Sequence, residues 1–206
     1  RFTAGISARG MLCVTPPEQR QKFPLIIHRN EILDMTIQQA FQDFHIETVV
    51  IKGANATDPE GNVGVITAGF DGGTVAYTIG TVTSTGLNYI FPVGLEKLVP
   101  SVKEAAKWAG AKTLDYSMGA NFGMFCLSDG IRVTEIEALN ILAGVEARHI
   151  ASGGVGGSEG AVVLIVAGEE ESVRKAITVV ESIKGEPSIE GLTGDCEVCR
   201  YDCCFA

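Results

Sequence analysis

The sequence has no apolar run long enough for a membrane-spanning helix, and this shortage limits the classes of protein that it can encode. A helix needs about 20 mainly apolar residues to cross a bilayer. The longest apolar run, at residues 161–167 (AVVLIVA), has the length of a strand and is bounded by glycine on both sides. We therefore expect a protein without a membrane partner.

Basic residues are also scarce. The 206 residues include 16 Lys and Arg against 25 Asp and Glu, which gives a formal net charge of −9. A surface this acidic repels nucleic-acid phosphates and anionic lipids, so we expect no nucleic-acid partner. Hydrophobic residues at 46% and charged residues at 20% are typical of a globular chain.

Cysteine is rare in most of the chain and crowded near its end. A secreted disulfide scaffold distributes its cysteines through the fold, so this arrangement favours a reducing, cytoplasmic compartment. The C-x2-C pair Cys196 and Cys199 has the spacing that lets two thiolates bind one tetrahedral metal ion, and Cys203 and Cys204 lie within reach. The tail at 191–206 is thus a candidate zinc or iron–sulfur site. Redox-active thiols or a tail disulfide are the alternatives, because two adjacent cysteines make a four-cysteine zinc site awkward.

The first part of the chain, residues 1–118, has the pattern of a layered α/β domain with a mostly parallel sheet. The expected strands lie at 25–28, 48–51, 63–68, 74–79 and 88–93. The expected helices lie at 32–44, with Asp34 as N-cap, and at 96–109. The chain opens on Arg1 and a strand-like phrase, so we expect that further sequence precedes it in the full protein.

The second part, residues 119–190, predicts a ferredoxin-like domain packed against the first. Its expected elements are strands at 122–127, 145–151, 161–167 and 187–189, and helices at 133–142, which Thr134 could cap, and at 172–183. This β-α-β-β-α-β order defines the ferredoxin-like pattern. The loop SGGVGGSEG at 152–160 favours a mobile hairpin over an anion or nucleotide clamp, because no G-K-[ST] and no helix follow it.

The strongest candidate site is the loop that follows the strand at 48–51. A buried strand of a parallel sheet carries ligand-binding loops at its carboxyl end. Lys52 would supply a charge for a phosphate or carboxylate, and Gly53 would let the backbone approach a ligand closely. The other candidate residues of this loop are Asn55, Gly61 and Asn62 for binding, and Asp58 for catalysis. The alternative is that residues 58–62 form only a turn.

Two further segments could contribute to a site. Gly72 and Gly73 could present backbone N–H groups to an anion or could form a hairpin turn, with no helix expected after them. Glu96 and Lys97 follow the strand at 88–93, so they would face the same crevice as Lys52, Glu96 as a second catalytic candidate. A solvated first helical turn is the alternative for this pair.

Three of these motifs resemble a known superfamily. IKGAN at 51–55, the D-x-E-G-N turn at 58–62 and PVGLEK at 92–97 are similar to motifs of ribose-5-phosphate isomerase, glucosamine-6-phosphate deaminase and the CoA transferases, including lactate-utilisation domains. The resemblance covers residues 48–100. It implies strand-end loops that hold a phosphorylated or CoA-linked substrate, and a carboxylate base or nucleophile. Asp58, Glu60 and Glu96 could each fill that role.

The sequence therefore supports three kinds of function. The leading hypothesis is a small-molecule-binding α/β protein, an isomerase or transferase acting on a phosphorylated, carboxylated or CoA-linked metabolite. The second is a non-enzymatic assembly or regulatory protein that forms a homo-oligomer, since residues 145–177 are similar to bacterial microcompartment shell domains. The third is a metal or redox protein that uses the cysteine tail.

Overall fold

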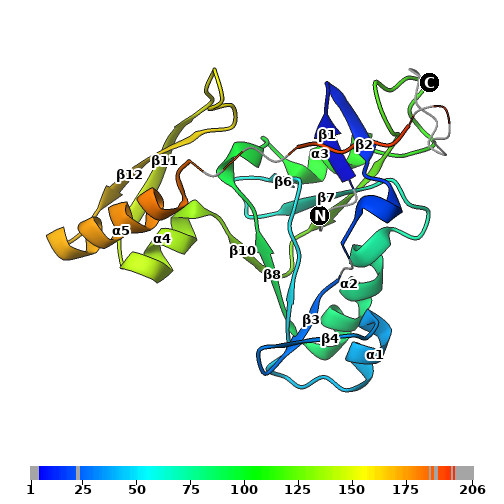
Figure 1. The fold of residues 1–206 in the computed structure, drawn as a ribbon, viewed down its shortest axis with the longest axis horizontal. Helices are drawn as coiled ribbons and strands as arrows, with labels where there is room; N and C mark the ends of the chain where they lie inside the picture. Colours follow the sequence, from blue (N-terminus) through cyan, green and yellow to red (C-terminus); the bar gives the residue numbers. More distant parts are fainter. Residues whose placement is uncertain (1–4, 22–23, 186, 188–189, 196, 198–206) are drawn as a thin grey trace.

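The structure, a computed structural model, is a mixed α/β fold in which several small sheets are combined with α-helices (Figure 1). It describes residues 5–21, 24–185, 187, 190–195 and 197. Among these residues, no helix combines the length and the apolar character that crossing a membrane requires.

Two antiparallel hairpins and a short helix precede the main sheets. Strand β1 (Gly5–Ala8) pairs with β2 (Met11–Val14), the 3-10 turn η1 (Pro17–Gln19) follows, and β3 (Ile26–His28) pairs with β4 (Glu31–Leu33). The helix expected at 32–44 is shorter, because α1 covers only Ile37–Gln42. Its N-cap is Thr36 rather than Asp34, since Thr36 and Gln39 form a reciprocal capping box.

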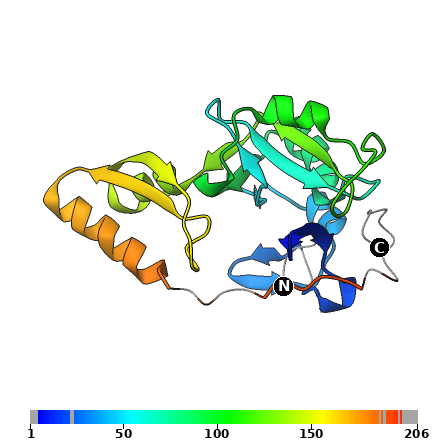
Figure 2. The same cartoon turned by 90° about the horizontal axis from the view of Figure 1, so that it is seen from above.

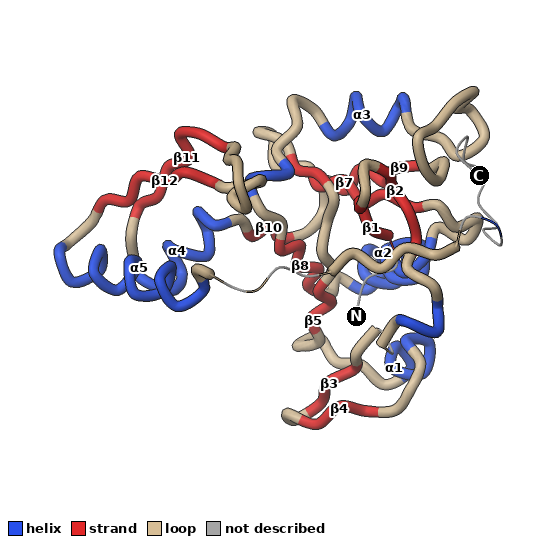
Figure 3. The backbone as a smooth tube through the Cα atoms, turned by 45° about the horizontal axis from the view of Figure 1, so that its top comes forward, coloured by secondary structure: helices blue, strands red, loops and turns tan. Residues whose placement is uncertain are grey.

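A three-stranded parallel sheet positions the candidate site. Its order is β10 (Ile131–Val133), β8 (Asn88–Pro92) and β5 (Val49–Ile51), with Ile90 of β8 opposite both Ile131 and Ile51. The hydrogen bonding between the strands continues for one residue beyond β5 and beyond β8. The Lys52 N–H donates to the Ile90 carbonyl and the Val93 N–H to the Val133 carbonyl, each at 3.0 Å. The carboxyl ends of all three strands therefore share one edge (Figure 3).

An antiparallel sheet completes the larger core. Its order is β6 (Ala56–Thr57), β7 (Val63–Thr67) and β9 (Gly123–Leu127), and β7 pairs with β9 over its full length. The buried cluster joins both sheets, with Val63 and Val65 from β7 and Tyr89 and Phe91 from β8. These side chains are at most 4% exposed, so burial of apolar area here stabilises both sheets together.

The prediction of a strand at 74–79 is wrong, because this segment lies within helix α2 (Gly73–Thr85). Its β-branched residues favour a strand on propensity alone. However, the buried residues Val75, Thr78 and Val82 recur at helical spacing, so the buried face decides the structure. Gly72, in the left-handed conformation with φ 69°, begins the helix, so Gly72 and Gly73 do not form the expected hairpin turn.

The helix expected at 96–109 is divided into two elements. The 3-10 turn η2 (Leu95–Lys97) directly follows β8, and α3 (Val102–Trp108) begins after Pro100. The hydroxyl of the N-cap Ser101 accepts the N–H of Glu104 at 3.2 Å. Pro100 restricts the residue before it to extended conformations, which separates the two elements.

The C-terminal elements form a second lobe with its own core (Figures 1 and 2). Helix α4 (Glu135–Ala143), the antiparallel strands β11 (Glu146–Ser152) and β12 (Val162–Ala167), and helix α5 (Glu170–Ile183) make it up. The N-cap Thr134 begins α4 as predicted. The buried residues Leu139, Ala143, Val145, Ala147 and Ala176 form the core of this lobe.

The ferredoxin-like arrangement is not confirmed. Strand β9 pairs with β7 and β10 pairs with β8, so neither shares a sheet with the β11–β12 hairpin. The strand expected at 187–189 lies largely outside the described residues. The domain boundary near residue 118 stays a prediction, although two strand pairings cross it.

Candidate functional site

Three of the predicted residues meet at the carboxyl edge of the parallel sheet. Lys52 is the first residue after β5, and Glu96 and Lys97 lie in η2, just after the neighbouring strand β8. The Glu96 carboxylate pairs with the Lys97 ammonium, with 3.6 Å between Oε1 and Nζ. Both side chains are partly exposed, at 34% and 41%, so the group is open to a molecule arriving from solvent.

The charge of Lys97 acts on Lys52. Burial lowers the pKa of the Lys52 ammonium from its usual value, and the positive charge of Lys97 lowers it further. Lys52 Nζ donates to the carbonyl of Gly53 at 3.0 Å, a neutral acceptor that does not compensate its charge. Among the described residues, Glu96 is the ion partner of Lys97, and the Glu135 carboxylate also lies at this edge, where it accepts the Leu95 N–H.

Glycines keep the backbone around these charges accessible. No atom lies within 4 Å of the place where a Cβ of Gly53 would stand. A Cβ on Gly94 would overlap the Glu96 carboxylate, which shows that the Glu96 side chain folds back over the end of β8. A ligand can therefore approach the backbone at Gly53 without meeting a side chain on that residue.

The glycine-rich hairpin loop of the second lobe lies beside the same group. The Cβ position of Gly160 is 3.7 Å from Cγ of Glu96, and β11 contacts η2. Gly153, Gly156 and Gly157 have positive φ angles of 122°, 64° and 95°. The edge of the parallel sheet is thus bordered by a loop that was expected to be only a hairpin connection.

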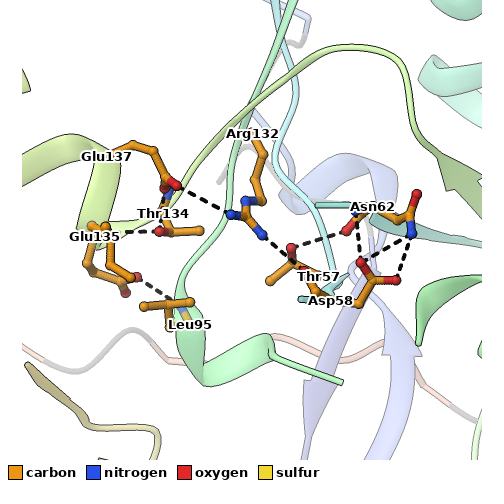
Figure 4. Close-up of polar contacts among 9 residues, drawn as sticks. Thr57, Asp58, Asn62, Leu95, Arg132, Thr134, Glu135 and Glu137 are labelled. Carbon is orange, nitrogen blue, oxygen red and sulfur yellow. Dashed lines mark hydrogen bonds and ion pairs between the residues drawn. The ribbon is translucent and has the colours of Figure 1, made fainter. Parts of the chain in front are cut away.

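Asp58 is buried in the turn that follows β6, away from solvent. Its carboxylate accepts the Asn62 backbone N–H at 2.9 Å and the Asn62 side-chain amide at 2.9 and 3.2 Å (Figure 4). It also accepts the Val102 N–H at 2.9 Å. Burial opposes ionisation, but these hydrogen bonds outweigh it and hold the pKa of Asp58 below its usual value. Since Val102 is the first residue of α3, Asp58 joins the turn at 58–62 to that helix.

A second polar cluster connects this turn to the start of α4. Arg132 donates to the Asp58 carbonyl at 3.0 Å and pairs with Glu137 at 3.3 Å, as Figure 4 shows. Glu135 accepts the Leu95 N–H at 2.9 Å, which fixes η2 against α4. Sequence reasoning identified Thr134 as a cap but missed Arg132, Glu135 and Glu137. The T-x-x-E spacing of Thr134 and Glu137 is the signature of the capping box that they form.

The other predicted binding residues have different surroundings. The side chain of Asn55 accepts the Ile66 N–H at 2.9 Å, and Gly61 and Asn62 belong to the Asp58 turn. Gly72 and Gly73 lie elsewhere, at the start of α2. Gly73 lines a shallow, mainly apolar cleft of about 370 Å³ with Tyr77 of α2 and residues 35–38 at the start of α1. The structure therefore divides the predicted site residues among three places.

The predicted metal site lies outside the described residues, because Cys196, Cys199, Cys203 and Cys204 all belong to the part of the tail that is not described. Within the described part, no three His, Cys, Asp or Glu side chains come together as a metal site would require. A zinc or iron–sulfur centre in the tail stays a prediction.

Comparison with known proteins identifies no relative: no protein family, curated protein or solved structure matches the chain. The resemblance to the isomerase, deaminase and CoA-transferase superfamily therefore stays a prediction. The function has to be argued from the geometry of the chain itself.

Proposed function

We propose that the chain binds a small carboxylated or phosphorylated metabolite at the carboxyl edge of its parallel sheet, with Lys52 and Lys97 pairing with the anionic group. The observation that supports this proposal is that Lys52 and Lys97 follow the neighbouring parallel strands β5 and β8 at their shared carboxyl edge, where the charge of Lys97 lowers the pKa of Lys52. Such strand ends are where open α/β sheets bind ligands. An anion placed between the two ammonium groups would relieve their repulsion.

The same arrangement fits an enzyme that moves a proton or a group on the bound metabolite. Glu96 is the candidate acid or base, because its carboxylate is partly exposed and lies beside Lys97. Asp58 fits this role less well, since its carboxylate is fully buried and engaged by α3 and Asn62. An isomerase or transferase acting on an anionic metabolite is the activity that we propose for this site.

Ligand-induced stabilisation tests the binding proposal. A screen of inorganic phosphate, sugar phosphates, carboxylates and acyl-CoAs by thermal unfolding should find a compound that raises Tm, since a ligand at 100 times its Kd stabilises by about 2.7 kcal/mol. Lys52→Met and Lys97→Met should each lose most of this stabilisation. Lys175→Met, which removes an exposed lysine from α5, should keep it.

The variants also define what would contradict the proposal. An active compound that stabilises Lys52→Met and Lys97→Met as much as the wild-type chain binds elsewhere. The stabilisation should also weaken as salt is added, because two exposed or half-buried cations are screened by counterions. A salt-independent effect would not come from these lysines.

A second candidate function, self-association, is favoured by strand β12. This strand has no charged residue, and its side chains Val163 and Ile165 are 46% and 56% exposed. Among the described residues, β12 pairs with β11 on one side and has no strand on the other. Antiparallel pairing of β12 with β12 of a second copy would give a four-stranded sheet with twofold symmetry. The other edge suits this less, since β11 carries Glu146 and Arg148 and an irregular register.

A charge placed on the open face of β12 tests this self-association. Ile165→Lys is expected to convert a wild-type dimer into a monomer in light scattering after size-exclusion chromatography, because a buried charge at a strand interface is costly. Ile141→Lys on α4, where the side chain is already 74% exposed, should leave the dimer intact. A wild-type chain that stays monomeric at the highest concentration reached would contradict the proposal.

A further inference from the structure

Lys52 has the surroundings of a lysine that can react as a free amine. Desolvation and a neighbouring cation are the two conditions that activate lysine as a nucleophile toward carbonyl compounds. Both act on Lys52, because the residue is partly buried just after β5 and Lys97 lies in η2, just after the neighbouring strand β8, so that its charge lowers the pKa of Lys52. The chain thus provides a lysine whose ammonium form is disfavoured, beside a second lysine that can hold an anion.

Two other described lysines, Lys107 and Lys97, lack this combination. Lys107 on α3 is 60% exposed, and its ammonium pairs with the Glu104 carboxylate at 2.6 Å. Lys97 itself pairs with Glu96. The Lys52 ammonium, in contrast, donates to the neutral carbonyl of Gly53, and the space beside Gly53 contains no atom within 4 Å of its Cβ position.

We propose that Lys52 forms an imine with the carbonyl carbon of a small anionic oxo-acid, while Lys97 pairs with the carboxylate of that acid. This inference rests on the proposed function, and it names the substrate class for the same site. An oxo-acid fits because it carries an anion and an electrophilic carbon one bond apart, so it can engage two lysines from neighbouring strand ends at once.

The chemical step needs no group that the chain and water do not provide. The unprotonated Nζ of Lys52 attacks the carbonyl carbon, and a C–N bond forms as the carbonyl π bond breaks. One proton passes from the attacking nitrogen to the oxygen and a second comes from solvent, so that the oxygen leaves as water and a protonated imine remains. Solvent can relay the first proton and supply the second, since Glu96 and Lys97 are partly exposed to it. Addition of water to the imine reverses the step and returns the free amine.

Reductive trapping tests this proposal on the full chain. The protein is incubated with pyruvate and sodium cyanoborohydride, whose hydride reduces the imine carbon to a stable secondary amine. Peptide mapping should then find the carboxyethyl group on Lys52 at least about tenfold faster than on Lys107, because the free amine is the reacting form. Inorganic phosphate should slow the labelling of Lys52 but not of Lys107.

Two variants separate the imine from the anion site. Lys52→Arg keeps the positive charge and removes the amine, so phosphate should still raise Tm while no adduct forms at position 52. Lys97→Met should slow the trapping several-fold even at saturating pyruvate. Equal labelling of Lys52 and Lys107 would overturn the imine and, if phosphate still stabilises through both lysines, would leave the anion site standing. Loss of both signals would overturn both proposals.

Discussion

Asp58→Ala is expected to destabilise the fold by about 3 kcal/mol or more, because it leaves buried hydrogen-bond donors without an acceptor. The backbone N–H groups of Asn62 and Val102 both point at this carboxylate, which is 0% exposed. Urea unfolding should show a lower midpoint with an unchanged slope. Glu60→Ala is the matched control. Glu60 lies in the same turn but is exposed, so its loss should change stability by less than about 0.5 kcal/mol.

The same carboxylate should make stability depend on pH. Because the pKa of Asp58 is lower in the folded chain than in the unfolded one, its stabilisation is complete above the unfolded pKa of about 3.9. It is then lost as pH falls through the folded pKa, since protonation removes the preference for the folded state. Asp58→Asn should be less stable at neutral pH and should lose less stability in this acidic window. Parallel pH profiles for the two proteins would contradict the role that we assign to Asp58.

The contacts of Asp58 also distinguish the two candidate catalytic carboxylates, Asp58 and Glu96. A carboxylate that is fully engaged by backbone and amide donors is a structural acceptor, and moving its proton would disrupt the start of α3. The Glu96 carboxylate is instead partly exposed and pairs with the side chain of Lys97. If Asp58 were catalytic, Asp58→Asn would abolish turnover even under conditions in which the variant is fully folded.

Local sequence patterns predicted the parts of the fold that depend on local burial. The β-branched runs predicted β5, β7 and β8 nearly to the residue, and the ends of β5 and β8 placed Lys52 and Lys97 at one edge. The hydrogen bond from Val102 to Asp58 could not be predicted this way, because the two residues are 44 positions apart. The pairing of β9 with β7 rather than with the second lobe has the same cause, since strand patterns do not encode partners.

Helix α2 shows a different limit of such reasoning. Its residues are rich in valine and threonine, which favour strands on propensity, yet tertiary burial of Val75, Thr78 and Val82 selects the helix. Had helical spacing been weighed over propensity, Gly72 would have been identified as the residue before a helix. The pair Gly72 and Gly73 would then have been assigned to a helix start, away from Lys52.

Gly130→Ala is expected to destabilise the larger core by about 3 kcal/mol, because this position combines a glycine-only backbone with a tightly packed neighbour. Gly130 has φ 133°, and a Cβ there would stand 2.6 Å from the Phe91 ring and 3.0 Å from the Tyr89 carbonyl oxygen. Neither neighbour can retreat, since Phe91 is 1% and Tyr89 2% exposed. The measurement is again the urea midpoint.

Replacement of Gly80 by alanine should raise the stability of the chain instead of lowering it. Comparing the two variants therefore tests the close packing at Gly130. Gly80 lies within α2, and no atom stands within 4 Å of its Cβ position. Gly80→Ala should therefore stabilise the chain by up to about 1 kcal/mol, since alanine restricts the unfolded chain and favours the helix. Because β10 begins directly after Gly130 and pairs with β8, Gly130→Ala should also weaken phosphate binding at the sheet edge, whereas Gly80→Ala should not. Equal midpoints for the two variants would mean that the close packing of Gly130 on Phe91 is absent in solution.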